Sequence, residues 1–199
     1  MNKFIEIPAT KRSLTQRAFV YGVGINDSEY MTSPVVDGKR IFCPFYVKWK
    51  SMIQRCYDPK ELNRNPCYID CYVCDEWLLF SNFKRWMKTQ EWKGLSLDKD
   101  ILKQGNKVYS PAFCIFVTQA INNLLCDSKA RRGEFPLGVS LHKAVNKYMA
   151  RVGDEVVGYF TDVDSAFNAY KAAKYKKIRE VAIIQSEPLR SALLNYKIR

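Results

Sequence analysis

Apolar residues in the middle of the chain recur at the three- and four-residue spacing of helices that bury one face. Between residues 45 and 57 the apolar face comprises Phe45, Trp49, Met52, Ile53 and Cys56, with lysine, glutamine and arginine on the other side. Residues 76–87 carry a second stripe, made of large aromatic side chains. Aromatic rings at this spacing are typical of buried cores. The pattern predicts helices over 45–57 and 76–87, with a short strand between them over 68–73.

The stretch 95–125 predicts the order strand, loop, strand and helix. Apolar and acidic residues alternate over 97–101, and a polar loop follows. A second apolar run, 114–117, leads to Thr118, which is a suitable N-cap for a helix. This is the layout of a ββα-metal finger, in which a divalent ion lies between a hairpin and a helix.

From residue 137 the chain alternates between apolar and polar side chains, with turns at 144–146 and 153–154. That alternation predicts three short antiparallel strands. Thr161 is placed to cap a helix that follows. The expected inner face of the sheet is Val139, Leu141, Tyr148, Ala150, Val152 and Val157, packed on Val163, Ala166, Phe167 and Tyr170 of that helix.

These elements predict an α+β fold in three segments. Residues 1–126 form a helical domain with the finger and an N-terminal extension. Residues 127–136 form a basic linker, and residues 137–199 form a domain with a small three-stranded antiparallel sheet on one helix, followed by a C-terminal tail.

The charge of the chain indicates what kind of partner it binds. The 199 residues carry a formal net charge of +12, with a pI near 9.4, which favours an anionic partner, and nucleic acid first among them. No run of eighteen apolar residues occurs, and the first twelve residues are polar and mixed, so we expect no membrane segment and a cytoplasmic location.

The face of the predicted sheet opposite its helix is polar and basic, as a surface that reads DNA bases would be. The expected contacts to double-stranded DNA are Ser140, His142, Lys143, Lys147, Met149 and Arg151. Arg131 and Arg132 of the linker would lie along the phosphate backbone. Two alternatives stay open: the linker is a solvated spacer, and His142 is a partly buried strand residue.

Seven cysteines are present, three of them as Cys67, Cys71 and Cys74. This spacing raises the question of zinc. Only one pair has the two-residue separation of zinc ligands, and the single histidine lies far downstream, so we favour the alternative that reduced cysteines fill the core.

Asp98 and an amide of Asn122 or Asn123 predict a site for Mg²⁺, which prefers oxygen ligands. We expect only one of the carboxylates Asp98 and Asp100 to face the finger helix. The structural alternative is that Asp98 pairs with Lys99 or Arg55 at the surface, while the asparagines cap the helix or face solvent.

Two regions resemble known families. Residues 138–173 resemble the Apetala/ethylene-response-factor type of DNA-binding domain, whose sheet enters the major groove. The motifs are Gly138-Val139, Tyr148-x-Ala150-x-Val152, Val157-Gly158-x-Phe160 and Ala166-x-x-Ala169-Tyr170. In that family arginines stand where this chain has Ser140 and His142.

The region before it resembles phage HNH-type endonucleases that carry such a domain. The motifs are Trp49-x-x-Met52-x-x-Arg55-Cys56-Tyr57, Cys74-x-Glu76-Trp77, Phe80-x-x-Phe83, Leu97-Asp98-x-Asp100, Tyr109-Ser110-Pro111-x-x-Cys114 and Asn122-Asn123. The resemblance implies metal-dependent, site-specific cleavage of DNA, as in homing endonucleases, inside a host cell if a phage encodes the chain.

One departure concerns the catalytic base. Lys99 stands where the family has the histidine that activates water, and an ordinary lysine stays protonated at neutral pH unless burial or a metal lowers its pKa. On the first interpretation Lys99 contacts the scissile phosphate, with Asp98 and Asp100 as the catalytic carboxylates. On the alternative interpretation the chain is a catalytically inactive HNH-like DNA-binding protein that acts as a regulator or as an inhibitor of a host defence protein.

Overall fold

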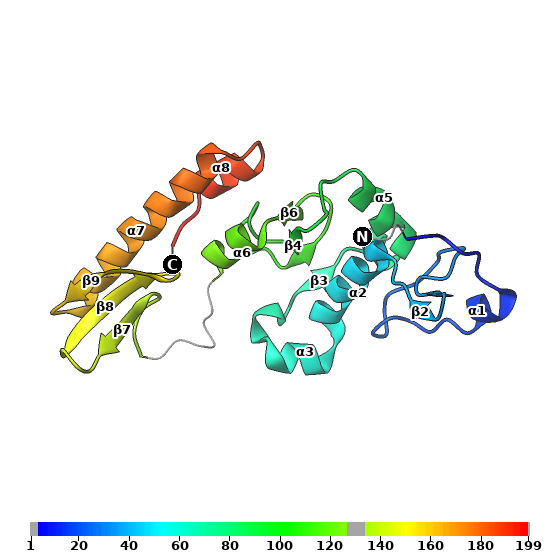
Figure 1. Ribbon diagram of the computed structural model, residues 1–199, viewed down its shortest axis with the longest axis horizontal. Coiled ribbons are helices and arrows are strands. Elements are labelled where there is room, and N and C mark those ends of the chain that lie inside the picture. Colours follow the sequence, from blue (N-terminus) through cyan, green and yellow to red (C-terminus); the bar gives the residue numbers. More distant parts are fainter. Residues whose placement is uncertain (1–3, 127–133, 199) are drawn as a thin grey trace. The chain divides into compact units, whose positions relative to one another are not determined.

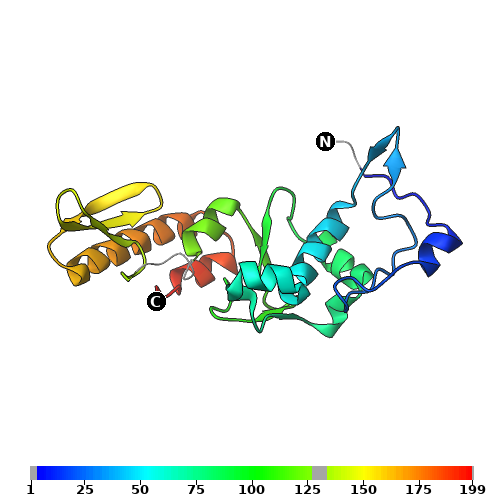
Figure 2. The same ribbon diagram turned by 90° about the horizontal axis from the view of Figure 1, so that it is seen from below.

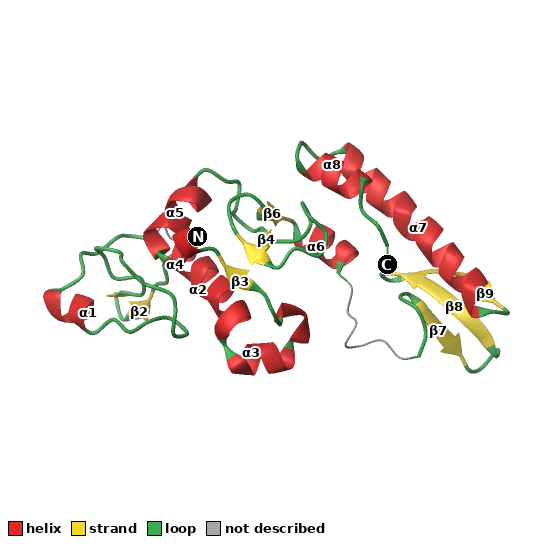
Figure 3. Cartoon of the chain, turned by 180° about the vertical axis from the view of Figure 1, so that it is seen from behind, coloured by secondary structure: helices red, strands yellow, loops and turns green. Residues whose placement is uncertain are grey.

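The computed structural model describes residues 4–126 and 134–198 and divides into two compact units, Met1–Phe116 and Val117–Arg199. Both units combine helices and strands, which confirms the predicted mixed α and β class (Figure 1). In the first unit helices dominate and the strands are very short, whereas the second holds one well-formed sheet (Figure 3). No helix in the described part of the chain is long and apolar enough to cross a membrane.

Helix α2 (Pro44–Tyr57) forms the centre of the first unit and matches its predicted range closely. Four of its five predicted apolar residues are buried, Trp49 and Ile53 fully so, whereas Phe45 is half-buried. The indole Nε1 of Trp49 donates a hydrogen bond of 2.7 Å to the carbonyl of Trp77. This bond ties α2 to the helical segment that contains Trp77 and satisfies a polar atom inside the aromatic core.

The single helix expected over 76–87 is instead two helices, α4 (Asp75–Leu78) and α5 (Phe80–Lys88). Leu79 between them is extended, with φ −86° and ψ 123°. Ile25 fills this break, because its N–H donates to the carbonyl of Leu78 and its carbonyl accepts from the N–H of Phe80. A segment far away in sequence therefore replaces the hydrogen bonds of the interrupted helix.

Four short strands complete the middle of the chain. Strand β3 (Tyr72–Val73) pairs in parallel with β5 (Val108–Tyr109), and β4 (Ser96–Asp98) pairs with β6 (Ile115–Val117). The strand expected over 68–73 is shortened because α3 (Pro59–Arg64) and a 3-10 turn (Pro66–Tyr68) precede it.

The N-terminal part of the first unit holds α1 (Lys11–Thr15) and a hairpin of β1 (Val35–Val36) and β2 (Lys39–Arg40). The guanidinium of Arg17 fixes the loop between them by donating to the carbonyls of Asn26, Ser28 and Tyr30. Sequence patterns predicted none of these elements, which are too short to show a periodicity.

The second unit begins with α6 (Gln119–Leu125), capped as predicted by Thr118, whose Oγ1 accepts from the N–H of Ile121 at 3.2 Å. The antiparallel sheet follows, with β7 (Val139–His142), β8 (Lys147–Val152) and β9 (Glu155–Phe160) in that order. Helix α7 (Val163–Ile183) runs along one face of this sheet (Figure 2).

The core of the second unit lies between α7 and the sheet. Its fully buried members include Ala150 and Ala166, and Val139, Val152 and Tyr170 surround them. Two expectations differ from the structure: the helix cap is Asp162 rather than Thr161, and Leu141 is 37% exposed rather than buried.

Helix α7 also continues to Ile183, well beyond the predicted apolar stripe that ends at Tyr170, because a further helix covers its C-terminal half. This is α8 (Leu189–Leu194), which buries Leu189 and Leu193 while α7 buries Ile178 and Ala182.

Candidate functional site

The uncovered face of the sheet carries most of the side chains predicted to contact DNA. Ser140 lies opposite Met149 in the β7–β8 ladder, and His142 lies opposite Lys147. Cross-strand partners share a face of a sheet, so these four residues lie on one surface. Lys143, also predicted, lies exposed in the turn after β7 rather than on this face.

Tyr159 belongs to the same face and was missed by the sequence-based prediction. It lies opposite Met149 in the β8–β9 ladder and is 47% exposed. Its phenol ring contacts the imidazole of His142, with ring centroids 5.4 Å apart and planes at 88°. Strict alternation would have placed Tyr159 on the inner face, because it follows Val157 of the predicted inner face by two residues. The register shift between Ala150 and Arg151 interrupts that alternation, and Tyr159 lies on the open face.

Arg151 lies at an irregularity of β8, where the register with β9 shifts between Ala150 and Arg151. Its Nη2 lies 3.0 Å from the Oδ1 of Asp154, and both side chains are substantially exposed. Surface ion pairs of this kind contribute at most about 1 kcal/mol, so the guanidinium is readily diverted to another anion.

His142 is half-buried, and its Nδ1 is buried without a hydrogen-bond partner within residues 4–126 and 134–198. The alternative prediction of a partly buried strand histidine therefore agrees with its surroundings. Its ring shapes the face by packing on Tyr159 more than it offers a polar atom to a ligand.

The lysines near the middle of α7 are largely engaged in the fold. Lys171 lies 4.7 Å from the ring centre of Phe167, and the buried ammonium of Lys174 donates to the hydroxyl of Tyr170 at 2.9 Å. Lys177 pairs with Glu155 of β9 at 2.6 Å. The basic residues of this unit therefore have different roles: several stabilise the fold, whereas Arg151 and Lys147 lie on the open face. The linker residues Arg131 and Arg132 lie outside the described residues.

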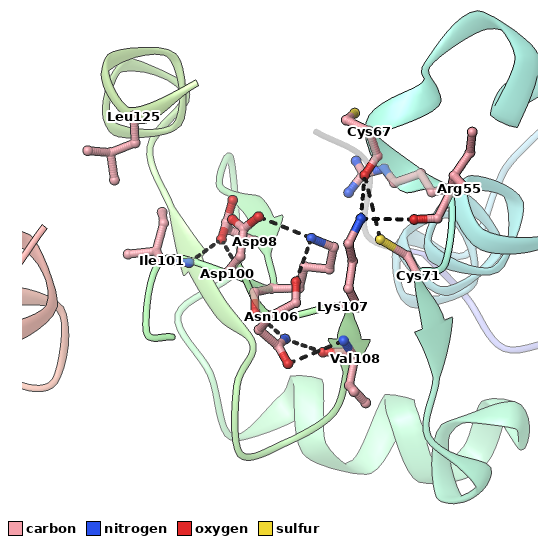
Figure 4. Close-up of polar contacts among 12 residues, drawn as sticks. Arg55, Cys67, Cys71, Asp98, Asp100, Ile101, Asn106, Lys107, Val108 and Leu125 are labelled. Carbon is pink, nitrogen blue, oxygen red and sulfur yellow. Dashed lines mark hydrogen bonds and ion pairs between the residues drawn. The ribbon is translucent and has the colours of Figure 1, made fainter. Parts of the chain in front are cut away.

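The loop after β4 holds the predicted catalytic residues of the first unit (Figure 4). The Oδ1 of Asp98 accepts hydrogen bonds of 2.8 Å from the N–H groups of both Asp100 and Ile101. The chain therefore turns at Asp98, and the strand expected to continue to residue 101 ends there. A carboxylate that caps a turn in this way fixes the position of the next residues.

Burial, followed by the nearby negative charge of Asp100, raises the pKa of Asp98 to about 6. A side-chain hydrogen bond to Asp100 acts in the same direction, whereas the two backbone N–H groups lower the pKa. The turn thus brings two carboxyl groups of the first unit together. Neither Lys99 nor Arg55 forms an ion pair with Asp98 in the described part of the chain.

Lys99 is 7% exposed, and its ammonium lies inside the loop. Its Nζ is 3.1 Å from the Oδ2 of Asp100 and donates to the carbonyl of Asn106 at 3.0 Å. Asn106 returns hydrogen bonds of 2.7 Å to the carbonyls of Lys99 and Val108, which closes the loop.

The pKa of Lys99 is raised above that of a free lysine. Burial acts to lower it, but the carboxylate of Asp100, with smaller contributions from Cys71 and Asp98, outweighs burial. Lys99 therefore keeps its charge at neutral pH, which leaves it without the capacity to accept a proton from water. Its contacts are those of a residue that positions the loop.

The other predicted metal ligands are distributed over both units. Asn122 and Asn123 lie on α6 of the second unit, where Asn123 accepts from Gln119 at 2.7 Å. Cys67 is exposed, Cys71 buried and Cys74 half-buried, and all are free thiols. Among the residues described by the structure, no three histidine, cysteine, aspartate or glutamate side chains gather as a metal-binding group.

Comparison with protein-family models, with curated proteins and with solved structures finds no match to this chain in any of the three.

Proposed function

We propose that the protein binds double-stranded DNA with the open face of β7, β8 and β9. The observation that supports this most is the composition of that face: Lys147 and Arg151 flank the packed pair His142 and Tyr159 on an otherwise small sheet. Cations match the phosphates of a duplex, and apolar rings beside them match the base edges and thymine methyl groups in its major groove. The net charge of +12 favours the same partner.

The residues of this face would have different roles in the complex. Arg151 would leave Asp154 and donate two hydrogen bonds to a guanine edge, as arginine does in the major groove. Lys147 would contact a phosphate and so fix the position of the sheet. His142 and Tyr159 would provide a rigid apolar ridge, because each ring restricts the other. Ser140, exposed on β7, would add a hydrogen bond to either base or phosphate.

Arg151→Ala tests this proposal. Its control is Lys176→Ala, which removes one exposed positive charge from α7. Fluorescence anisotropy with a pool of duplexes gives the affinity of each variant at several salt concentrations. We expect Arg151→Ala to lose about 1–3 kcal/mol of binding free energy and Lys176→Ala to lose much less. Equal losses for both variants would show that charge alone, and not this face, binds the DNA.

Metal-dependent cleavage of DNA is a second candidate, favoured by the proximity of Asp98 and Asp100. Two adjacent carboxylates provide the hard oxygen ligands that Mg²⁺ takes, and a bound ion would relieve their repulsion. It would stabilise the charge that develops on a phosphodiester during hydrolysis. Lys99 would hold Asp100 in place, and the base that activates water would have to be a group other than Lys99.

The double variant Asp98→Asn, Asp100→Asn separates this second candidate from DNA binding. With Mg²⁺ or Mn²⁺ present, we expect the wild type to nick or cut duplex DNA. We also expect the metal ion to raise the melting temperature of the wild type above that of the metal-free protein. The double variant should show neither the cleavage nor this rise. Lack of cleavage across many substrates, with DNA affinity intact, would exclude the nuclease. The protein would then be an HNH-like binding protein that acts as a regulator or inhibitor.

A further inference from the structure

The N-terminal hairpin is a longer ribbon than its two labelled strands suggest. Val35 pairs with Arg40 and Val36 with Lys39. The ladder continues through the N–H of Ile41, which donates to the carbonyl of Pro34 at 2.9 Å. At its base the N–H of Cys43 donates to the carbonyl of Thr32 at 2.8 Å, and both of these residues are buried. Residues 32–43 therefore form a two-stranded ribbon anchored in the first unit.

The tip of this ribbon is a tight turn at Asp37 and Gly38, whose φ angles are 50° and 73°. Two successive residues with positive φ are typical of the turns whose twist matches that of the strands they join. The anchored base and the specified turn make the ribbon a defined projection (Figure 2).

One exposed face of the ribbon combines apolar side chains with a cation. Val35 and its cross-strand partner Arg40 share this face with Phe42, which follows Arg40 by two residues. Val35 is 59% exposed and Phe42 is 56% exposed. Val35 and Phe42 lie diagonally across the ribbon and offer apolar contact area beside the charge of Arg40.

Positive charge occupies both faces of the ribbon near its tip. Arg40 lies on the apolar face, and Lys39, one residue earlier, points to the opposite face. Both side chains are exposed, and neither has an ion pair or hydrogen bond within the parts of the chain that the structure describes. Asp37, in the turn, is the only acidic residue of the ribbon.

We propose that this ribbon is a DNA-binding arm that enters the major groove of a duplex. A two-stranded β-ribbon has the width that this groove admits. Cations on both faces would reach the phosphates of both groove walls, and Phe42 with Val35 would contact base edges and thymine methyl groups. An acidic protein surface would match the charges, but it offers no groove for a projecting ribbon with cations on both faces.

This inference goes beyond the proposed function of the C-terminal sheet, because the ribbon belongs to the other unit and makes its contacts with its own residues. It implies two separate DNA contacts in one chain. Two linked contacts increase overall affinity and lengthen the recognised site.

The test compares full-length variants in duplex-DNA binding over a range of salt concentrations. Lys39→Ala, Arg40→Ala removes both cations of the ribbon, and Phe42→Ala removes its ring. The matched control, Lys88→Ala, Lys93→Ala, removes two exposed lysines from elsewhere in the same unit. Thermal melting verifies that each variant is folded, as expected for substitutions at exposed positions.

We expect the ribbon double variant to bind at least about tenfold more weakly and to reduce the salt slope by about 1.8, since each lost phosphate contact accounts for about 0.9. Phe42→Ala should weaken binding about fivefold without changing the slope, because it removes apolar contact with thymine methyl groups and no charge. The control should leave the slope unchanged.

Three results would overturn the inference. The first is equal behaviour of the ribbon double variant and its control, and the second is wild-type affinity in Phe42→Ala. The third is that the ribbon variants lose binding to phosphatidylserine vesicles while they retain full duplex binding, which would assign the ribbon to a membrane surface. If Arg151→Ala weakens DNA binding while the ribbon variants do not, only the ribbon fails; if the wild type binds no duplex, both proposals fail.

Discussion

The imidazole of His142 stands edge-on to the phenol ring of Tyr159, with ring centroids 5.4 Å apart. The two residues come from β7 and β9, so their contact crosses the central strand β8 on the open face of the sheet. We expect this pair to be the rigid part of the DNA-binding face. Tyr159→Ala should lower duplex affinity by about 1–3 kcal/mol, because it removes a ring that stacks or packs on DNA and also frees His142 to rotate.

Tyr159→Phe provides the matched control for that prediction. It retains the ring that contacts His142 and removes only the hydroxyl. Anisotropy titrations should therefore place Tyr159→Phe close to the wild type and Tyr159→Ala well below it. If both substitutions have the same effect, the hydroxyl matters and the ring pair does not.

Asp98→Asn should stabilise the protein at neutral pH. The pKa of Asp98 is about 6 in the folded state and 3.8 as a reference for the unfolded chain. The folded state thus binds the proton more tightly, so this group makes the free energy of unfolding fall as pH rises from about 4 to about 6. An asparagine keeps the acceptor for the two N–H groups but carries no charge.

The expected gain in unfolding free energy is about 2–3 kcal/mol at pH 7.5 and near zero below pH 4, from about two pKa units at 1.36 kcal/mol each. Urea unfolding at a series of pH values measures it. Asp70→Asn, which removes one carboxylate at an exposed position of the same unit, is the control. A difference between Asp98→Asn and wild type that is independent of pH would contradict the assignment.

Asn106→Ala should destabilise the first unit by about 2–3 kcal/mol. The substitution leaves the carbonyls of Lys99 and Val108 without their 2.7 Å hydrogen bonds and loosens the loop around a buried ammonium. Asn63→Ala, at an exposed position of α3, serves as the control and should change stability by less than about 0.5 kcal/mol. Equal stability of the two variants in denaturant unfolding would show that Asn106 does not hold the loop.

Gly138→Ala should lower the stability of the second unit much more than Gly153→Ala does. A Cβ at this position would lie 2.1 Å from the Cδ2 of Tyr170, and φ is +74°. Gly153→Ala is the matched control, since its φ is +60° but nothing lies within 4 Å. We expect a loss above about 3 kcal/mol for Gly138→Ala and about 1 kcal/mol for Gly153→Ala, measured by thermal melting. Similar losses would mean that backbone conformation alone explains both.

Local patterns were sufficient for the elements that bury one regular face. The alternation over 137–160 located the three strands, and the stripe from Trp49 to Cys56 located α2. These predictions succeeded because burial on one side imposes a period that is visible in a single segment.

Features that depend on distant partners could not be predicted in this way. The break at Leu79 requires Ile25, and the extension of α7 requires the cover provided by α8. The state of Lys99 likewise depends on Asp100 and on burial together, which oppose each other in their effect on its pKa. The sequence shows that position 99 is a lysine where the HNH family has a histidine base. That the ammonium of Lys99 is enclosed by the loop is shown only by the structure.

The most direct test of DNA binding by the sheet is site-specific photocrosslinking. A photoreactive phenylalanine analogue replaces Ser140, which is exposed on the open face, or Lys176, which is exposed on α7. Each full-length variant is irradiated with labelled duplex DNA. The account predicts a crosslink from position 140 and none from position 176. A crosslink from position 176 with none from position 140 would contradict it.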